Sequence, residues 1–272
     1  MGGTPYSPAF EADKIHGCRV IYLELGEINL DLIHALKSAD NKVVLFHMGD
    51  ERADKNTSYY SACDLVIRNY YFPHIVSKFS GSTKVIWAPN GFRSGVGPRE
   101  TKTLKKASER QATASFLGWV NNVSSYGGER EIFLKVTALC QNNLFFVPSN
   151  GFAGGYNVGL YAAILEDSIF APCPAGNSPE TIRLYDALEM GAIPISLNHD
   201  FLVSKNALAS IGSVPFPIID SWESLPTYLE KMKNLLLTEP SAILKLQADC
   251  IEWWARYKKE TAHRLLKSIS EL

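Results

Sequence analysis

The apolar residues in the first half of the chain fall into four short runs. Continuous β-branched and aromatic residues predict strands at residues 18–23, 42–48, 64–70 and 84–87. Apolar residues at helical spacing predict helices at residues 29–38 and 74–79. Strands that alternate with helices pair in parallel through right-handed crossovers, so this half is expected to form one α/β sheet.

The second half repeats this alternation and predicts a second sheet. Strands are predicted at residues 114–119, 143–147, 168–171 and 192–196, with a last strand region at 214–220. Helices are predicted at residues 129–140, 159–166, 178–190, 221–237 and from 240 onwards.

The two halves are joined by a polar segment. Residues 92–111 have almost no apolar side chains and cannot supply a core, which is typical of a linker. The chain is therefore expected to form two Rossmann-like α/β domains. The expected bounds are 1–95 for the first domain, 96–111 for the linker, 112–240 for the second domain, and 241–272 for a C-terminal helix returning across the interface.

Residues 170–196 combine a strand end, a loop, a helix start and a second strand. Ser178 is a good N-cap and Pro179 suits the first helical position. The unpaired N–H groups and the dipole at a helix start favour a bound anion. Gly176, Asn177 and Ser178 are therefore candidate ligands of a diphosphate.

Polar side chains further along this helix, and one glycine, extend the candidate site. Arg183 could donate two hydrogen bonds to phosphate oxygens, and Asp186 or Glu189 could accept from ribose hydroxyls. Gly118, in a predicted strand, would let the backbone approach a ligand. Spacing alone leaves an alternative, in which Arg183 pairs with Glu180 or Asp186 along a solvated helix face.

The same stretch resembles the signature of the exostosin-like glycosyltransferases. The matching residues are Cys173-Pro174, Gly176, Ser178-Pro179, Arg183, Asp186-Ala187 and Gly191-Ala192-Ile193-Pro194. Ala175 departs from the family, which usually has Arg there, and Asp186 stands where Glu is commoner. The missing Arg removes one candidate donor ligand, and the shorter Asp side chain reaches less far toward a ribose.

The first half resembles the branch of this family that contains the ribitol-phosphate xylosyltransferases. It carries His-x-x-Asp-Glu at residues 47–51, Leu-Val-x-Arg-Asn-Tyr at residues 65–70 and Pro-Asn-Gly at residues 89–91. The resemblance implies the arrangement called GT-B, in which two Rossmann-like domains face a cleft, with the first domain of this chain abbreviated. It also implies transfer of a sugar, with inversion, from a UDP-sugar such as UDP-xylose to a glycan or polyol hydroxyl.

Polar side chains follow the predicted strand ends of the first half, where ligands of open parallel sheets bind. His47, Asp50 and Glu51 follow the second strand, Arg68 ends the third, and Asn90 follows the fourth. Displacement with inversion needs a base opposite the diphosphate, and Asp50 or Glu51 could take the acceptor proton. Asp50 is the preferred base, while His47, Arg68 and Asn90 would line the acceptor side.

These residues also have structural alternatives. Asp50 and Glu51 could cap the segment that follows them. Arg68 could form a buried ion pair with Asp64 or Glu51. If neither Asp50 nor Glu51 is the base, the next candidates are His47 and Glu24.

The composition of the chain argues against several classes of function. The 272 residues are 46% hydrophobic and carry a net charge of −1, which gives no support to nucleic-acid binding. The five cysteines lack a C-x-x-C pair, which argues for buried thiols and against a zinc site. No apolar run reaches the length of a membrane span, so none is expected. The chain as written is predicted to be cytoplasmic, or to act in the Golgi lumen if an N-terminal anchor has been removed.

No cofactor or metal is predicted beyond the nucleotide-sugar donor. An Asp-x-Asp triplet is absent, and the helix dipole with Arg183 could neutralise the leaving phosphate. The expected partners are the donor and a glycan or polyol acceptor, and a second copy of the chain could supply missing acceptor elements. The alternative function is a non-catalytic sugar-nucleotide or glycan binding subunit. A phosphorylase- or epimerase-like use of the same architecture would give phosphate or sugar-isomer products instead.

Overall fold

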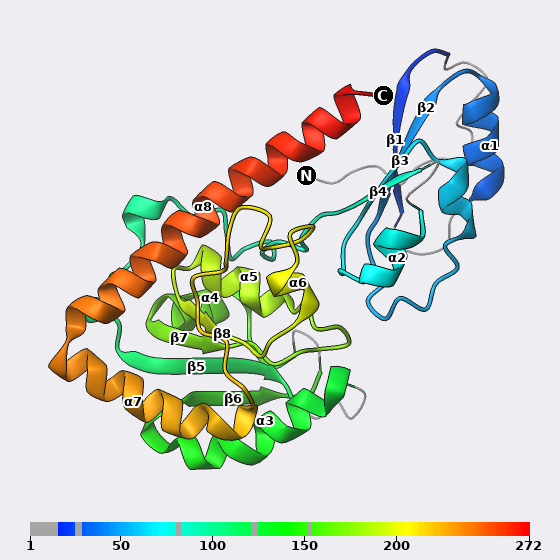
Figure 1. Ribbon diagram of the computed structural model, residues 1–272. Coiled ribbons are helices and arrows are strands. Elements are labelled where there is room, and N and C mark those ends of the chain that lie inside the picture. The colour runs from blue at the N-terminus through cyan, green and yellow to red at the C-terminus, as the bar shows by residue number, and fades with distance from the viewer. Residues whose placement is uncertain (1–15, 25–28, 80–82, 121–124, 152–153) are drawn as a thin grey trace. The chain divides into compact units, whose positions relative to one another are not determined.

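The computed structural model describes residues 16–24, 29–79, 83–120, 125–151 and 154–272. The chain divides into two compact units, one formed by the residues up to Ala88 with Ala262–Leu272, the other by Pro89–Thr261. Each unit contains one parallel four-stranded sheet (Figure 1). The two α/β sheets predicted from the sequence are confirmed.

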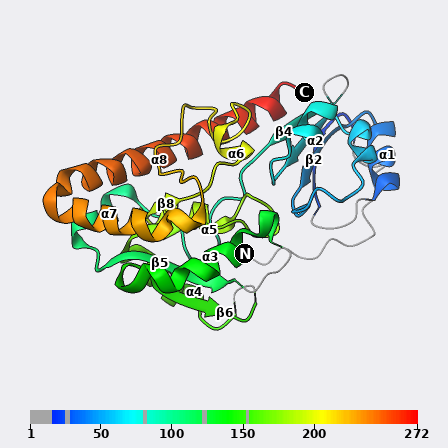
Figure 2. The same cartoon turned by 60° about the horizontal axis from the view of Figure 1, so that its bottom comes forward.

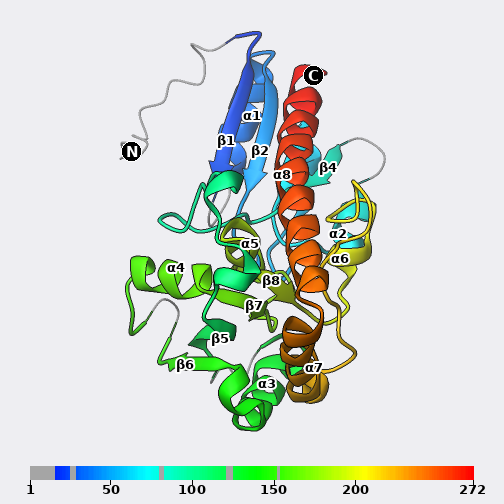
Figure 3. The same ribbon diagram turned by 90° about the vertical axis from the view of Figure 1, so that its left-hand side faces the viewer.

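The sheet of the first unit has the strand order β1-β2-β3-β4. Its strands are β1 (Arg19–Glu24), β2 (Lys42–His47), β3 (Leu65–Arg68) and β4 (Lys84–Trp87). One face packs against α1 (Leu30–Ser38), α2 (Pro73–Lys78) and the 3-10 helix η2 (Ser58–Ala62). The other face packs against Leu265 and Ile269 near the C-terminus. Figure 3 shows the C-terminal end of the chain beside β2. Both faces of β2, β3 and β4 are covered, which explains why these strands read as continuous apolar runs, whereas Ile21 and Leu23 of β1 are exposed.

The sheet of the second unit has the strand order β6-β5-β7-β8. Its strands are β5 (Ala112–Trp119), β6 (Phe145–Ser149), β7 (Ser168–Pro172) and β8 (Ile193–Ile195). One face is covered by α4 (Val158–Glu166) and α5 (Ile182–Glu189), and the other by α3 (Glu129–Thr137) and α7 (Leu225–Thr238), as Figures 1 and 2 show. Phe116 of β5 and Phe133 of α3 pack with ring centroids 4.7 Å apart.

Two further helices complete the described part of the chain. α6 (Asp200–Val203) follows β8, and α8 (Pro240–Ser270) is the longest helix. The residues of α8 up to Thr261 belong to the second unit, and those from Ala262 belong to the first. Within the described ranges, no helix has both the length and the apolar character needed to cross a membrane.

The helix that follows the candidate phosphate loop (residues 173–181) begins later than predicted. α5 begins at Ile182 with Thr181 as its N-cap, so the prediction of an N-cap at Ser178 is wrong. The preceding loop folds back on itself, since the Gly176 N–H donates to the Ser178 carbonyl at 3.0 Å. The Ser178 hydroxyl donates to the Glu180 carbonyl at 3.2 Å rather than capping a helix.

The strand region predicted at residues 214–220 is not a strand. Its ladder is limited to an isolated bridge between Ser196 and Ile218. Pro215 and Pro217 lack the N–H that a ladder needs, which explains why an apolar segment here does not extend the sheet.

The polar segment expected to be a linker packs onto the second unit. Val96 is buried in the apolar core of that unit, and Ala107 is fully buried. Arg110 donates to the carbonyl oxygens of Ser168 and Met190 at 2.8 and 2.9 Å. The division of the chain in the structure therefore falls at Ala88, ahead of the expected bounds.

The five cysteines are free thiols, and only Cys18 is exposed. Burial raises the pKa of the Cys63, Cys173 and Cys250 thiols to about 12. The pKa of Cys140 is raised by burial to about 11. Because only the thiolate is nucleophilic, these four side chains should be inert in the folded protein.

A thiol-labelling experiment should therefore separate one cysteine from the other four. At pH 8 in native buffer, a colorimetric disulfide reagent is expected to modify one thiol per chain rapidly, and all five in denaturant. Rapid labelling that persists in Cys18→Ser would contradict the burial described for the remaining four.

Candidate functional site

The carboxyl edge of the second sheet brings together several sequence-predicted site residues. Gly118 is the penultimate residue of β5, and the loop 173–181 follows β7. Arg183 lies in the first turn of α5, directly after this loop. Ligands of open parallel sheets bind beyond this edge, so it is the candidate donor side of the protein.

Arg183 is buried without a counter-charge. Its side chain is 6% exposed, and its guanidinium carbon lies 4.0 Å from the centroid of the Phe116 ring. One Nη–H donates to the Tyr161 hydroxyl at a long 3.5 Å, and the buried Nε has no hydrogen-bond partner. Among the described residues no carboxylate pairs with it. An unpaired buried charge is costly, which makes Arg183 the clearest candidate to bind an anion.

Gly118 provides the space that the Arg183 guanidinium occupies. A Cβ atom at this position would overlap with Nη2 of Arg183. The glycine predicted to admit a ligand instead admits this side chain at the end of β5. At Gly176, a Cβ atom would lie 3.0 Å from Nη2 of Arg130.

The two acidic candidates of α5 are already engaged by an earlier segment of the chain. Asp186 is fully buried and accepts hydrogen bonds from the Arg93 backbone N–H and Nε at 2.9 and 2.7 Å. Glu189 accepts from the Arg99 N–H at 2.7 Å and pairs with Lys258 at 2.6 Å. The ribose contacts predicted for both acids remain predictions.

The helix-surface alternative for Arg183 is wrong. Asp186 pairs with Arg93, and Glu180 accepts from the Asn90 N–H at 2.9 Å and from the Tyr185 hydroxyl at 2.8 Å. Neither acid is paired with Arg183, whose side chain is buried rather than solvated.

In the first unit, Asp50 forms the buried ion pair. Its Oδ2 lies 3.2 Å from Nη2 of Arg68, and the two side chains are 1% and 0% exposed. Its Oδ1 accepts from the N–H groups of Asp54 and Lys55 in the turn after β2, where no helix begins, so Asp50 holds a turn and does not cap a helix. Arg68 therefore pairs with Asp50 and not with Asp64 or Glu51, the partners considered from the sequence.

His47 joins the same buried network. Its Nδ1 lies 2.6 Å from the Tyr60 hydroxyl, which also accepts from Arg68 at 3.2 Å. Burial raises the pKa of Tyr60 to about 12 against the lowering effect of Arg68, so this phenol is neutral at physiological pH. This buried network stabilises the carboxyl ends of β2 and β3, where His47 and Arg68 lie.

Glu51 is more exposed than Asp50, and it is held by Tyr70. Its Oε1 accepts from the Tyr70 hydroxyl at 2.8 Å. Tyr70 has a φ of 54°, a left-handed conformation that is strained for a bulky residue. Asn90 belongs to the second unit, so the structure does not place it with the other acceptor-side candidates.

Sequence reasoning missed several polar residues at the carboxyl edge of the second sheet. Glu129 and Arg130 begin α3, and His199 follows β8. The Glu129 and His199 side chains lie 2.9 Å apart, and both are buried. The sequence signal for this group was the pair of charged residues, Glu129 and Arg130, at the start of a predicted helix that follows a predicted strand.

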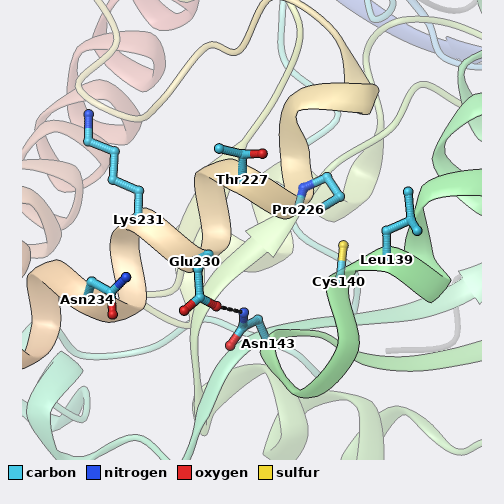
Figure 4. A pocket seen from close by; sticks show the side chains of 8 residues that line it. All are labelled: Leu139, Cys140, Asn143, Pro226, Thr227, Glu230, Lys231 and Asn234. Carbon is cyan, nitrogen blue, oxygen red and sulfur yellow. Dashed lines mark hydrogen bonds between the residues drawn. The ribbon is translucent and has the colours of Figure 1, made fainter.

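A surface hollow of the second unit contains none of the candidate site residues. It has a volume of about 640 Å³ and lies between α7 and the 3-10 helix η6 (Ala138–Asn143), at the amino end of β6 (Figure 4). Its buried Asn143 is held by Glu230 of α7 at 2.6 Å. In the described ranges, no cluster of three or more histidine, cysteine or acidic residues could hold a metal ion.

The fold is that of the GT-B glycosyltransferases. The chain is similar to an alpha-glucosyltransferase solved with UDP-glucose and DNA, with a TM-score of 0.57, 8% identity, and coverage of 89% of this chain and 75% of that one. It is also similar to a UDP-forming alpha,alpha-trehalose-phosphate synthase from Burkholderia vietnamiensis, with a TM-score of 0.52, 11% identity, and coverage of 89% and 71%. At these identities the likeness concerns the fold alone.

The chain belongs to the family described as the RXYLT1 C-terminal domain, whose model matches residues 97–272. It is 30% identical to human ribitol-5-phosphate xylosyltransferase 1 over 113 residues, which cover 37% of this chain and 24% of the relative. The zebrafish (Danio rerio) protein of the same description is 23% identical over 120 residues, 41% of this chain and 26% of the relative. The chain therefore matches about a quarter of the length of these relatives. The predicted likeness to the ribitol-phosphate xylosyltransferases is confirmed by the family match at residues 97–272, whereas the motifs at residues 47–91 that suggested it lie outside that match.

Proposed function

We propose that this chain transfers a sugar from a nucleotide donor to a hydroxyl of a glycan or polyol. The donor is a UDP-sugar, with UDP-xylose the first to test, and transfer proceeds with inversion and without a metal ion. The family match, the GT-B fold and the resemblance to exostosin-like enzymes support this class of reaction.

The observation that carries the proposal is the uncompensated charge of Arg183. A buried guanidinium with no carboxylate partner among the described residues, at the carboxyl edge of a parallel sheet, suits a diphosphate. The backbone of Asn177 and Ser178 lies in the loop just before α5 and would complete the anion site. The predicted role of Gly176 is less well supported, because its N–H donates to the Ser178 carbonyl and its carbonyl accepts from the Tyr126 N–H. Asp186 and Glu189 would act indirectly, by holding residues 93–99 against α5.

Incubation with UDP-sugars tests the proposal. The enzyme should release UDP from one UDP-sugar, faster with a hydroxyl acceptor, and the product should carry the inverted anomeric configuration. The rival function is a sugar-nucleotide binding subunit, which the burial of Asp50 favours. Thermal stabilisation by UDP with neither hydrolysis nor transfer would support that rival.

For the catalytic base, the geometry favours Glu51 over Asp50. Asp50 is tied to Arg68 and to two backbone N–H groups, whereas Glu51 is partly exposed and oriented by Tyr70. Glu51→Gln is therefore expected to lower turnover by roughly 10² to 10⁴-fold, because general base catalysis is lost. The measurement is kcat with saturating donor, together with the Kd for UDP, which should not change. Near-full turnover in this variant would place the base elsewhere.

A further inference from the structure

A single buried carboxylate connects three loops at the carboxyl edge of the second sheet. Glu129, at the start of α3, is 5% exposed. Its Oε2 accepts hydrogen bonds from the Ala175 backbone N–H at 3.0 Å and from Nε1 of Trp222 at 2.9 Å. Its Oε1 lies 2.9 Å from Nε2 of His199, which follows β8. The candidate phosphate loop is thus tied to α3 through a peptide N–H.

The next residue, Arg130, holds the same loop through the carbonyl group of Ala175. Nε of Arg130 donates to the Ala175 carbonyl at 3.1 Å, and its Nη1 donates to the carbonyl of Trp119, the last residue of β5, at 2.6 Å. In addition, the Tyr126 N–H donates to the Gly176 carbonyl at 2.7 Å. Two consecutive side chains of α3 therefore satisfy both the N–H and the C=O of Ala175.

This arrangement gives the loop an order that its own sequence does not provide. Pro172, Pro174 and Pro179 cannot donate backbone hydrogen bonds, so the loop has few internal ways to satisfy its carbonyl groups. A loop already fixed before its ligand arrives binds more tightly, because the ordering cost does not fall on binding. The Ala175 side chain itself is fully buried, so the loop presents backbone rather than a side chain at that position.

We infer that Glu129 and Arg130 are positioning residues that form a clamp around the Ala175 peptide. The clamp fixes the loop that presents the backbone of Asn177 and Ser178 to the diphosphate of the donor, and the His199 imidazole lies beside the Glu129 carboxylate. This inference rests on the proposed function in one respect, the identity of the ligand. The clamp itself is a property of the folded chain.

The test compares variants of the clamp with a matched control in the 272-residue chain. The clamp variants are Glu129→Ala, Arg130→Ala and Glu129→Gln, whose amide oxygen can still accept from Ala175. The control is Ser168→Ala, at the opposite end of β7, which removes the buried hydrogen bond to Ser115 at 2.7 Å. Two quantities are measured: the Kd for UDP by calorimetry, and hydrogen exchange of the Ala175 amide.

Glu129→Ala and Arg130→Ala should each weaken UDP binding by about tenfold, the effect of one charge-assisted hydrogen bond. Glu129→Ala should also accelerate exchange at Ala175, while amides inside β5 and β7 keep their protection. Glu129→Gln should restore the Kd to within about threefold of wild type. Ser168→Ala should lower the Tm without changing the Kd.

The clamp is refuted if Glu129→Ala folds, binds UDP with the wild-type Kd and keeps its protection at Ala175. It is also refuted if Ser168→Ala weakens UDP binding as much as the clamp variants do, because the effect would then reflect stability alone. If the wild-type chain binds no UDP, the proposed donor is wrong, and exchange at Ala175 decides on the clamp. Lost protection in Glu129→Ala then supports it, and unchanged protection overturns it.

Discussion

Replacing Arg183 with methionine is expected to weaken UDP binding by more than about 100-fold. Two charge-assisted hydrogen bonds to the diphosphate would be lost, each worth roughly 1.5–3 kcal/mol. The milder Arg183→Lys change should cost on the order of 2 kcal/mol, because an ammonium cannot reproduce the planar fork of a guanidinium.

The same substitution is expected to leave the ligand-free protein at least as stable as the wild type. Arg183 is 6% exposed and has no ion-pair partner among the described residues. A buried charge without a partner opposes folding, and methionine removes it while keeping apolar contact with the Phe116 ring. The Tm without ligand should therefore stay constant or rise.

Arg110 offers a matched control of the opposite kind. It is equally buried, but its guanidinium binds the carbonyls of Lys105, Ser168 and Met190. Arg110→Met should lower the Tm, since these carbonyls would be left unsatisfied, and should not change the Kd for UDP. If Arg183→Met lowers the Tm as much as Arg110→Met does, Arg183 has a structural role and is not an unpaired anion ligand.

Asp50→Asn is expected to destabilise the first unit by about 3–5 kcal/mol. Asparagine would leave the Arg68 guanidinium, which is fully buried, without its counter-charge. The loss should appear as reduced hydrogen-exchange protection of the β2 and β3 amides, since these strands carry the network of Asp50, Arg68 and His47.

The control for this experiment is Asp249→Asn, which removes an exposed ion pair with Lys245. An exposed pair contributes at most about 1 kcal/mol. If Asp50→Asn is no more destabilising than this control and still abolishes turnover, Asp50 would be the base and not a structural anchor.

Strands such as β2, β3 and β7 were predictable because both of their faces are buried. Lys84–Trp87, for example, was predicted at its observed bounds, since a short apolar run bounded by turn signals is typical of a buried strand. Residues 214–220 look similar in composition, but Pro215 and Pro217 remove the donors that a ladder requires. There, composition indicated a strand that backbone hydrogen bonding does not allow.

The site was only partly predictable. Arg183 and Gly118 were predicted from local motifs, but their mutual contact depends on strand order and cannot be read from spacing. Glu129 was missed because its partners, Ala175 and Trp222, lie far along the chain. The N-cap prediction at Ser178 failed for a related reason, because hydrogen bonds within and around the loop override local capping preference.

The role of the acidic residues in α5 shows the same limit. Asp186 has the spacing of a ribose ligand in sequence, yet in the structure it accepts from both the backbone and the side chain of Arg93. The partner belongs to a polar segment that composition identifies only as a linker. Its path over α5 is set by these hydrogen bonds, which no local pattern reveals.

The central claim is that the carboxyl edge of the second sheet binds the diphosphate of a nucleotide sugar through Arg183. Calorimetric titration of the 272-residue chain with UDP and, separately, with uridine tests it most directly. One UDP should bind per chain, and uridine should bind at least about 100-fold more weakly. This difference in affinity should be lost in Arg183→Met. Equal binding of UDP and uridine, or a UDP preference that survives in Arg183→Met, would contradict it.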